Sequence, residues 1–183
     1  SKNFNVQKRS FDQKNRIWLS LPGTQKEADI ISKITNAKLF LEEEASALNI
    51  QMEESPKILH IATHSFYIGD NKDDNLFSEN IFSNSITNNK RIENPLLRSG
   101  IVLAGANYPD KNLKDDGYLT ALEVSKLNWN GTELVVVSGC ESGQGDLQSG
   151  EGVYGLKRAI AVAGARSSLL SLWEVNDKAT AEF

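Results

Sequence analysis

The fold of this chain is decided by the stretch Glu133-Leu134-Val135-Val136-Val137-Ser138-Gly139-Cys140-Glu141-Ser142-Gly143. A short run of aliphatic and β-branched residues that ends among small residues is typical of a central strand, buried on both faces of a parallel sheet. A second such run, Ile58-Leu59-His60-Ile61-Ala62-Thr63-His64-Ser65, lies earlier in the chain. Ligands of open α/β sheets bind just beyond the carboxyl ends of the strands. The two runs therefore predict that Cys140 and His64 lie together at such an edge.

Further expected strands and helices alternate along the chain, which indicates a mostly parallel sheet with helices on both faces. The other expected strands are residues 17–19, 38–41, 100–104 and 167–173. A helix is expected from Thr24, with Glu27 at the spacing of a capping box. The remaining expected helices are residues 42–52, 120–127 and 151–163, and one that begins near residue 176.

A polar stretch from Gly69 to Asn94 is longer than the loops of most compact domains, which indicates a functional or disordered segment. It contains Lys90-Arg91 among many small polar residues, a composition that proteases cut readily. We expect this loop to be cut or reordered on activation.

The overall composition excludes several classes of protein. The 183 residues suffice for one domain with a full core, and a net charge of −4 offers no basic surface for nucleic acid or membrane. One cysteine excludes an internal disulfide and fits a reducing compartment. The start lacks the apolar core of a signal peptide, and no apolar stretch approaches the about 18–20 residues of a membrane span. We therefore expect a cytoplasmic protein, cut at both ends from a longer chain.

The position of Cys140 favours a reactive thiol over a packing residue. A packing cysteine belongs within the run Val135–Val137, whereas Cys140 follows it among small residues. A thiol needs an adjacent base or positive charge to become a thiolate near neutral pH. The chain has two histidines: His60 lies inside its strand and is expected to be a hydrogen-bonded structural residue, while His64 lies at the strand exit. His64 is therefore the candidate base.

Other site chemistries fit the sequence less well. Gly150, Gly152 and Gly155 match a dinucleotide-binding pattern, but that pattern must follow its strand directly, and here about ten residues intervene. The acidic pairs Asp73-Asp74 and Asp115-Asp116 are more typical of solvated loops than of calcium sites. We expect no cofactor and no metal.

Several short motifs occur in a fixed order along the chain. They are Leu21-Pro22-Gly23-Thr24 with Glu27, Ile58–Ser65, Asn94-Pro95-Leu96-Leu97-Arg98-Ser99-Gly100, Asp116-Gly117 with Leu119-Thr120-Ala121, Ser138-Gly139-Cys140-Glu141-Ser142-Gly143, Gly150-Glu151-Gly152-Val153 and Ser171-Leu172-Trp173. Together they closely resemble the CHAT domain, the caspase-like peptidase domain found with TPR repeats in bacteria. The resemblance covers nearly everything from Leu21 to Phe183.

This resemblance implies an α/β fold, the caspase-like three-layer α/β/α sandwich with a mostly parallel central sheet. Residues 1–20 would be an N-terminal linker or edge segment, and residues 21–183 the peptidase domain, truncated at its C-terminus. By motif position, His64 is the catalytic histidine and Cys140 the nucleophile. The backbone N–H groups of Ser65 and Cys140 are the implied oxyanion donors.

The chain departs from the family at three positions beside this dyad. Ser65 replaces the usual glycine, and its Cβ is expected to restrict the backbone. Gly139 replaces the commoner alanine, which we expect to be a mild change. Ser138, two residues before the nucleophile, is small and neutral, so a strict preference for Asp or for Arg/Lys in the substrate does not follow. Besides Ser138, the candidate substrate-binding residues are three acids in nearby loops: Asp116, Asp146 and Glu151.

The function implied is a cysteine endopeptidase that cleaves a protein substrate. An attached sensor or TPR region would regulate it in a bacterial signalling system or in antiviral defence. The alternative is a catalytically silent interaction or scaffold module that keeps the fold. A nucleotide-binding protein is the third possibility.

Overall fold

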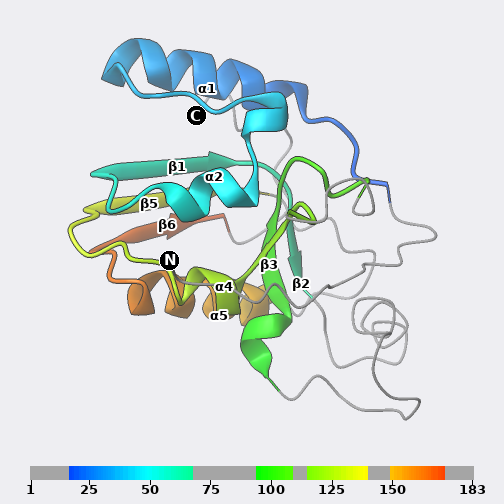
Figure 1. Ribbon diagram of the computed structural model, residues 1–183, viewed down its shortest axis with the longest axis vertical. Coiled ribbons are helices and arrows are strands. Elements are labelled where there is room, and N and C mark those ends of the chain that lie inside the picture. The colour runs from blue at the N-terminus through cyan, green and yellow to red at the C-terminus, as the bar shows by residue number, and fades with distance from the viewer. Residues whose placement is uncertain (1–16, 68–93, 109–114, 140–148, 172–183) are drawn as a thin grey trace.

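The computed structural model describes residues 17–67, 94–108, 115–139 and 149–171, in which two three-stranded sheets form the frame (Figure 1). The first sheet has the order β1-β5-β6, and both of its strand pairs are parallel. Its strands are β1 (Ile58–Ala62), β5 (Leu134–Ser138) and β6 (Ser168–Leu170). The second sheet has the order β2-β3-β4 and is antiparallel. Its strands are β2 (Ser65–Tyr67), β3 (Ser99–Val102) and β4 (Tyr118–Thr120).

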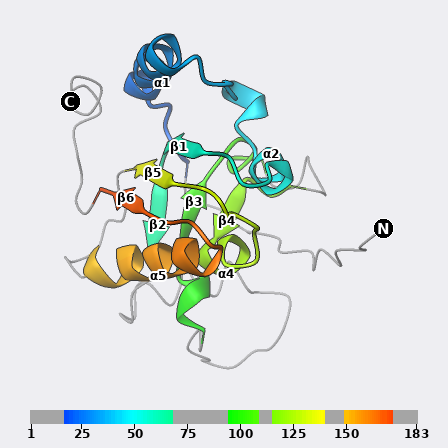
Figure 2. The same cartoon turned by 90° about the vertical axis from the view of Figure 1, so that its left-hand side faces the viewer.

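The helices lie on both sides of the parallel sheet. Figures 1 and 2 show α1 on one side and α4 and α5 on the other. The α-helices are α1 (Pro22–Thr35), α2 (Ala47–Met52), α4 (Ala121–Val124) and α5 (Ser149–Val162). Two 3₁₀ turns complete the elements: η1 (Glu42–Glu44) and η2 (Pro95–Leu97). The described chain is thus a mixed α/β structure.

Both apolar runs form strands of the parallel sheet, as predicted, and they pair with each other. The expectation that both are buried central strands is wrong for β1, which lies at the edge of the described sheet with Ile61 as its one buried residue. The register joins Ile58 to Leu134 at one end and Ala62 to Ser138 at the other. Beyond the last pair, the Thr63 N–H donates to the Ser138 carbonyl at 3.0 Å. The two strands therefore end at paired residues, at the same edge of the sheet.

The chain passes from the parallel sheet into the antiparallel sheet through Thr63 and His64. The Thr63 hydroxyl donates to the Val102 carbonyl at 2.6 Å. In return, the Val102 N–H donates to the His64 carbonyl at 2.9 Å. His64 therefore lies at the joint between the two sheets, where backbone hydrogen bonds fix its main chain.

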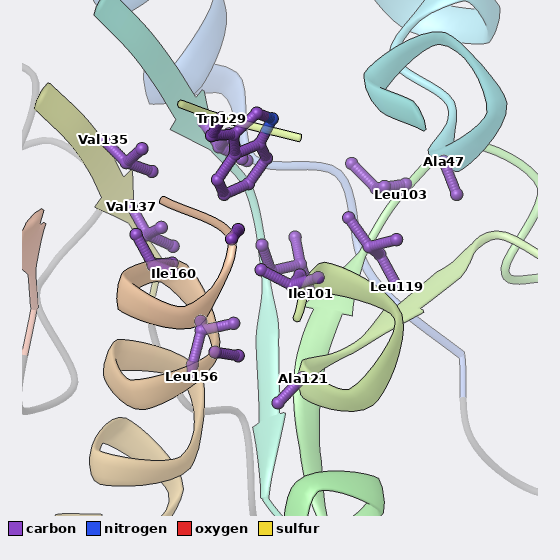
Figure 3. Close-up of a cluster of buried hydrophobic side chains, with 14 residues drawn as sticks. Ala47, Ile101, Leu103, Leu119, Ala121, Trp129, Val135, Val137, Leu156 and Ile160 are labelled. Atoms are coloured by element: carbon purple, nitrogen blue, oxygen red, sulfur yellow. The ribbon is translucent and has the colours of Figure 1, made fainter. Parts of the chain in front are cut away.

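One hydrophobic core joins both sheets to the helices on the α5 side (Figure 3). Along β5 the burial alternates: Val135 and Val137 are buried, while Val136 and Ser138 are half-buried. Alternate residues of a strand point to opposite faces of the sheet. Because Val135 and Val137 point into the core on the α5 side, Ser138 lies on the opposite face, toward α1. Burying side chains of this size stabilises the fold by about 1.5–3 kcal/mol each. The core thereby fixes which face of β5 the site residues occupy.

Two of the segments that the sequence predicts as strands form no strand in the structure. Residues 17–21 and 36–41 have no regular structure, and the expected helix over residues 42–52 is divided into η1 and α2. The capping box at Thr24 is also wrong, because α1 begins at Pro22, whose fixed φ suits the first helical turn. The Thr24 hydroxyl instead donates to the Leu21 carbonyl.

The expectation of a mostly parallel sheet holds for β1, β5 and β6, whereas β2, β3 and β4 are antiparallel. An apolar run shows that a strand is buried but does not record the direction of its partner. β3 begins one residue earlier and ends two residues earlier than the strand expected at residues 100–104. Thr120 caps α4 through a capping box with Glu123, which confirms the expected start of that helix.

Gly117 and Gly105 provide a matched pair for testing the loop that leads into β4. Both have a positive φ, +76° and +95°, which costs an alanine about 1–2 kcal/mol. A Cβ on Gly117 would lie 2.0 Å from the Ala106 nitrogen, whereas the nearest atoms around Gly105 are 3.9 Å away. We expect Gly117→Ala to lower the free energy of unfolding by about 1–3 kcal/mol more than Gly105→Ala, measured by denaturant unfolding. Equal losses would contradict this account of Gly117.

Candidate functional site

The imidazole of His64 is held through its Nε2 atom. This nitrogen lies 2.7 Å from the carbonyl oxygen of Leu19, in the segment before α1. A carbonyl oxygen can only accept, so Nε2 carries the hydrogen. In the neutral ring the lone pair then lies on Nδ1, which makes Nδ1 the atom available to act as a base.

Nδ1 of His64 is buried and has no hydrogen-bond partner among the described residues. A buried polar atom without a partner costs about 1–3 kcal/mol. Catalytic groups are one class of such atoms, and three other described side-chain atoms share this state: Ser99 Oγ, Trp129 Nε1 and Thr132 Oγ1. Cys140, the predicted partner of His64, lies outside the described residues.

Trp18 packs against the ring of His64, with ring centroids 5.3 Å apart and planes inclined by 41°. Trp18 is 8% exposed, while its neighbours Ile17 and Leu19 are largely exposed. The sequence predicts a strand over residues 17–19, and that prediction includes neither contact with His64. The one signal in the sequence was an apolar triplet within an otherwise polar segment.

Ser65 opens β2 and pairs with Ile101 of β3. The bond from Val102 N–H to the His64 carbonyl makes this a non-hydrogen-bonded pair of the antiparallel ladder. The N–H of Ser65 therefore points away from β3. The backbone of Ser65 does not have a positive φ. A Cβ is thus compatible with this extended strand, and the restriction expected from Ser65 stays a prediction.

Gly139 leads from β5 to Cys140 and is tightly enclosed. Its N–H donates to the Ser171 hydroxyl at 3.1 Å, and that hydroxyl donates to the Gly139 carbonyl. A Cβ at this position would lie 2.7 Å from the Thr63 carbonyl oxygen and 3.6 Å from the Cβ of Ser65. The expectation that glycine instead of alanine is a mild change is therefore wrong, because alanine would displace the backbone at the end of β1.

Glu27 of α1 forms hydrogen bonds with one residue of β1 and one residue of β5. Its Oε1 accepts a hydrogen bond from His60 Nε2 at 2.6 Å, and its Oε2 accepts one from the Ser138 hydroxyl at 3.3 Å. The side chain of Glu27 is 12% exposed. The expectation that His60 is a hydrogen-bonded structural residue is confirmed. The carboxylate that contacts Ser138 belongs to Glu27, for which the sequence pattern predicts a role in helix capping.

Of the other candidate substrate-binding residues, Asp116 is the one whose side chain the structure describes. Asp116 precedes β4, and its Oδ1 accepts a hydrogen bond from the Tyr118 N–H at 3.0 Å. Glu151 lies in the first turn of α5, and its side chain is outside the described set. Asp146 lies outside the described residues, as does the predicted processing loop apart from Asn94. The roles of these residues stay predictions.

Asp115 is a structural residue, 7% exposed. Its carboxylate accepts hydrogen bonds from the N–H groups of Leu48 and Gly117, both at 2.9 Å.

Within the part of the chain that the structure describes, no group of three or more His, Cys, Asp or Glu side chains could hold a metal ion. In that same part, none of the helices has the length and apolar character needed to cross a membrane.

A comparison with protein families matches residues 2–183 to the model of the CHAT domain. Comparisons with curated proteins and with solved structures find no significant match.

Glu27 is expected to stabilise the face of the sheet toward α1. Glu27→Ala removes the partner of both His60 and Ser138, so we expect a loss of about 2–3 kcal/mol in the free energy of unfolding. Glu27→Gln keeps an acceptor oxygen for one of them and should lose less. The control is Glu53→Ala, which breaks the exposed ion pair with Lys38 and should cost less than about 1 kcal/mol. Denaturant unfolding measures all three, and equal losses for Glu27→Ala and Glu53→Ala would contradict this role.

Proposed function

Since the chain belongs to the CHAT domain family, whose fold is caspase-like, we propose that it is a cysteine endopeptidase that cleaves a protein substrate. Cys140 is the proposed nucleophile, and His64 the proposed general acid and base. The fold is proposed to be the three-layer α/β/α sandwich of caspase-like proteins.

One observation carries the assignment of the dyad. The pairing of β1 with β5 ends at Ala62 and Ser138, and each candidate lies two residues beyond its end of this pair. Neighbouring strands lie about 4.8 Å apart. Equal offsets from a pair in register favour a short distance between the imidazole of His64 and the thiol of Cys140. The Nδ1 atom of His64, which has no hydrogen-bond partner in the described part of the chain, supports the same assignment.

The chemistry follows from the state of the imidazole. Nδ1 of His64 accepts the proton of the Cys140 thiol, and the thiolate attacks the carbonyl carbon of the scissile peptide. The imidazolium then protonates the leaving amine, and a thioester remains. In the second half, Nδ1 takes a proton from water as the water oxygen attacks the thioester carbon. The C–S bond then breaks, the product leaves as the new carboxylic acid, and the imidazolium returns its proton to the Cys140 sulfur. The Leu19 carbonyl keeps its bond to Nε2–H throughout and stabilises the imidazolium.

The N–H groups of Ser65 and Cys140 are the proposed oxyanion donors. The non-hydrogen-bonded pairing of Ser65 with Ile101 leaves its N–H directed away from β3, as such a donor requires. Donors of this kind stabilise the developing negative charge on the tetrahedral intermediate. The proposed substrate-binding residues are Ser138, Asp116, Asp146 and Glu151.

The proposed setting is cytoplasmic, with a TPR or other regulatory region that switches the peptidase in bacterial signalling or antiviral defence. A silent scaffold is the alternative. The extended backbone of Ser65 argues against that alternative, because the departure from glycine does not disturb the strand that carries the proposed oxyanion donor.

Cleavage of a diverse peptide library, with products identified by mass spectrometry, tests the peptidase. We expect Cys140→Ala to abolish cleavage and His64→Asn to reduce it by about 10²–10⁴-fold, because proton transfer is lost. The control, Glu53→Ala at the C-terminal end of α2, should cleave like the wild type. Labelling with a thiol-directed probe is measured in parallel. No cleavage, together with labelling of Cys140 no faster than free cysteine, would contradict the proposal and favour the scaffold.

Ser65→Gly is expected to cleave at a rate close to that of the wild type. Glycine keeps the backbone N–H, and the extended strand does not need the extra freedom of glycine. Initial rates on one good substrate measure this. A large gain in rate would contradict it, since it would mean that the Cβ of Ser65 holds the N–H away from the oxyanion.

A further inference from the structure

The carbonyl that fixes His64 lies in a segment that has no regular structure of its own. Residues 17–20 belong to no helix or strand, and Trp18 is the one buried residue among them. Leu19, whose carbonyl accepts from His64, has a side chain that is 74% exposed and cannot anchor the backbone. The position of this carbonyl therefore depends on what holds Trp18.

Asn107 binds both backbone groups of Trp18. The Trp18 N–H donates to Asn107 Oδ1 at 2.9 Å, and Asn107 Nδ2 donates to the Trp18 carbonyl at 2.9 Å. One side-chain amide thus makes the same two bonds that a paired strand residue exchanges across an antiparallel ladder. This fixes the peptide units on both sides of Trp18, directly before the Leu19 carbonyl.

Tyr118 of β4 holds the indole ring. The Trp18 Nε1–H donates to the Tyr118 hydroxyl at 2.9 Å, in a buried contact. That hydroxyl in turn lies 3.4 Å from the Ala106 carbonyl, to which it donates. The Tyr118 ring is 3% exposed and packs edge-on against Phe66, with centroids 5.9 Å apart. The indole is therefore fixed to the antiparallel sheet, with its ring against His64.

We propose that Asn107 and Tyr118 are positioning residues for His64. Acting through Trp18, they keep the Leu19 carbonyl on Nε2 and so leave Nδ1 as the base. This inference deepens the proposed function and rests on it for its catalytic consequence. When the Asn107 bonds are lost, the Leu19 carbonyl shifts, the imidazole turns, and the tautomer with hydrogen on Nδ1 becomes populated. That tautomer cannot accept the thiol proton.

NMR of the protein with ¹⁵N-labelled histidine tests the positioning directly, because the chain contains two histidines and the tautomer of each neutral ring can be read separately. The main variant is Asn107→Asp, which keeps the size and one acceptor but loses the donor to the Trp18 carbonyl. We expect the wild type to hold His64 with hydrogen on Nε2, and Asn107→Asp to show a mixture of tautomers. His60, bound to Glu27, serves as the internal reference and should not change.

Tyr118→Phe is the second variant, because it removes one hydroxyl and leaves the ring that packs in the core. It should shift the His64 tautomer in the same direction, by a smaller amount. The matched control is Asn49→Asp, which removes the analogous bond from Asn49 Nδ2 to the Glu44 carbonyl, on α2, and should leave His64 unchanged. Circular dichroism establishes that each variant is folded.

Peptide cleavage then links the positioning to catalysis. Asn107→Asp should lower kcat on the order of 10- to 100-fold with little change in KM, as expected when a reacting group is misplaced by a fraction of an ångström to an ångström. Folded variants whose His64 tautomer matches the wild type would overturn the positioning role. A tautomer shift without cleavage by any form, wild type included, would support the positioning role and overturn the proposed function.

Discussion

Five consecutive residues of β1 pair in register with five of β5, and the Thr63 N–H extends this ladder by donating to the Ser138 carbonyl. Both strands must therefore leave the sheet at the same level. Gly139 is held between this ladder and the Ser171 hydroxyl, with no space for a Cβ beside the Thr63 carbonyl. The geometry of the candidate site is a consequence of this backbone pairing, because side-chain contacts alone would leave the strand ends free to slide.

Three parts of the chain then converge on the face of this sheet toward α1. Glu27 joins α1 to His60 and Ser138, and so connects both β1 and β5 to the helix. The segment before α1 supplies the carbonyl that binds His64. The antiparallel sheet contributes the bond from Val102 N–H to the His64 carbonyl. His64 is thereby constrained at its main chain by one sheet and at its imidazole by the segment before α1.

Much of the fold could be predicted because dense apolar runs indicate strands, as they did for β1 and β5. The same runs overstated the burial of β1, in which Ile61 is the one buried residue. The segments at residues 17–19 and 38–41 look similar in sequence but are not strands, since short apolar triplets form a strand only when a partner edge is available. Glu27 illustrates a second limit. A glutamate three residues after a threonine fits a capping box, but Pro22 starts the helix earlier and frees the carboxylate to reach His60.

The sequence by itself determined that a thiol and an imidazole follow two buried strands, and its ordered motifs determined the family. The positions of strands and turns can be predicted from periodicity and composition because they depend mainly on the residues of each segment itself. Tertiary structure alone decided that the second sheet is antiparallel and that Leu19, Trp18 and Glu27 surround the site. It also decided that Nδ1, and not Nε2, is the nitrogen of His64 without a partner among the residues that the structure describes. These contacts join residues 33 to 111 positions apart, and the pattern of one segment does not encode the partner that packing brings to it.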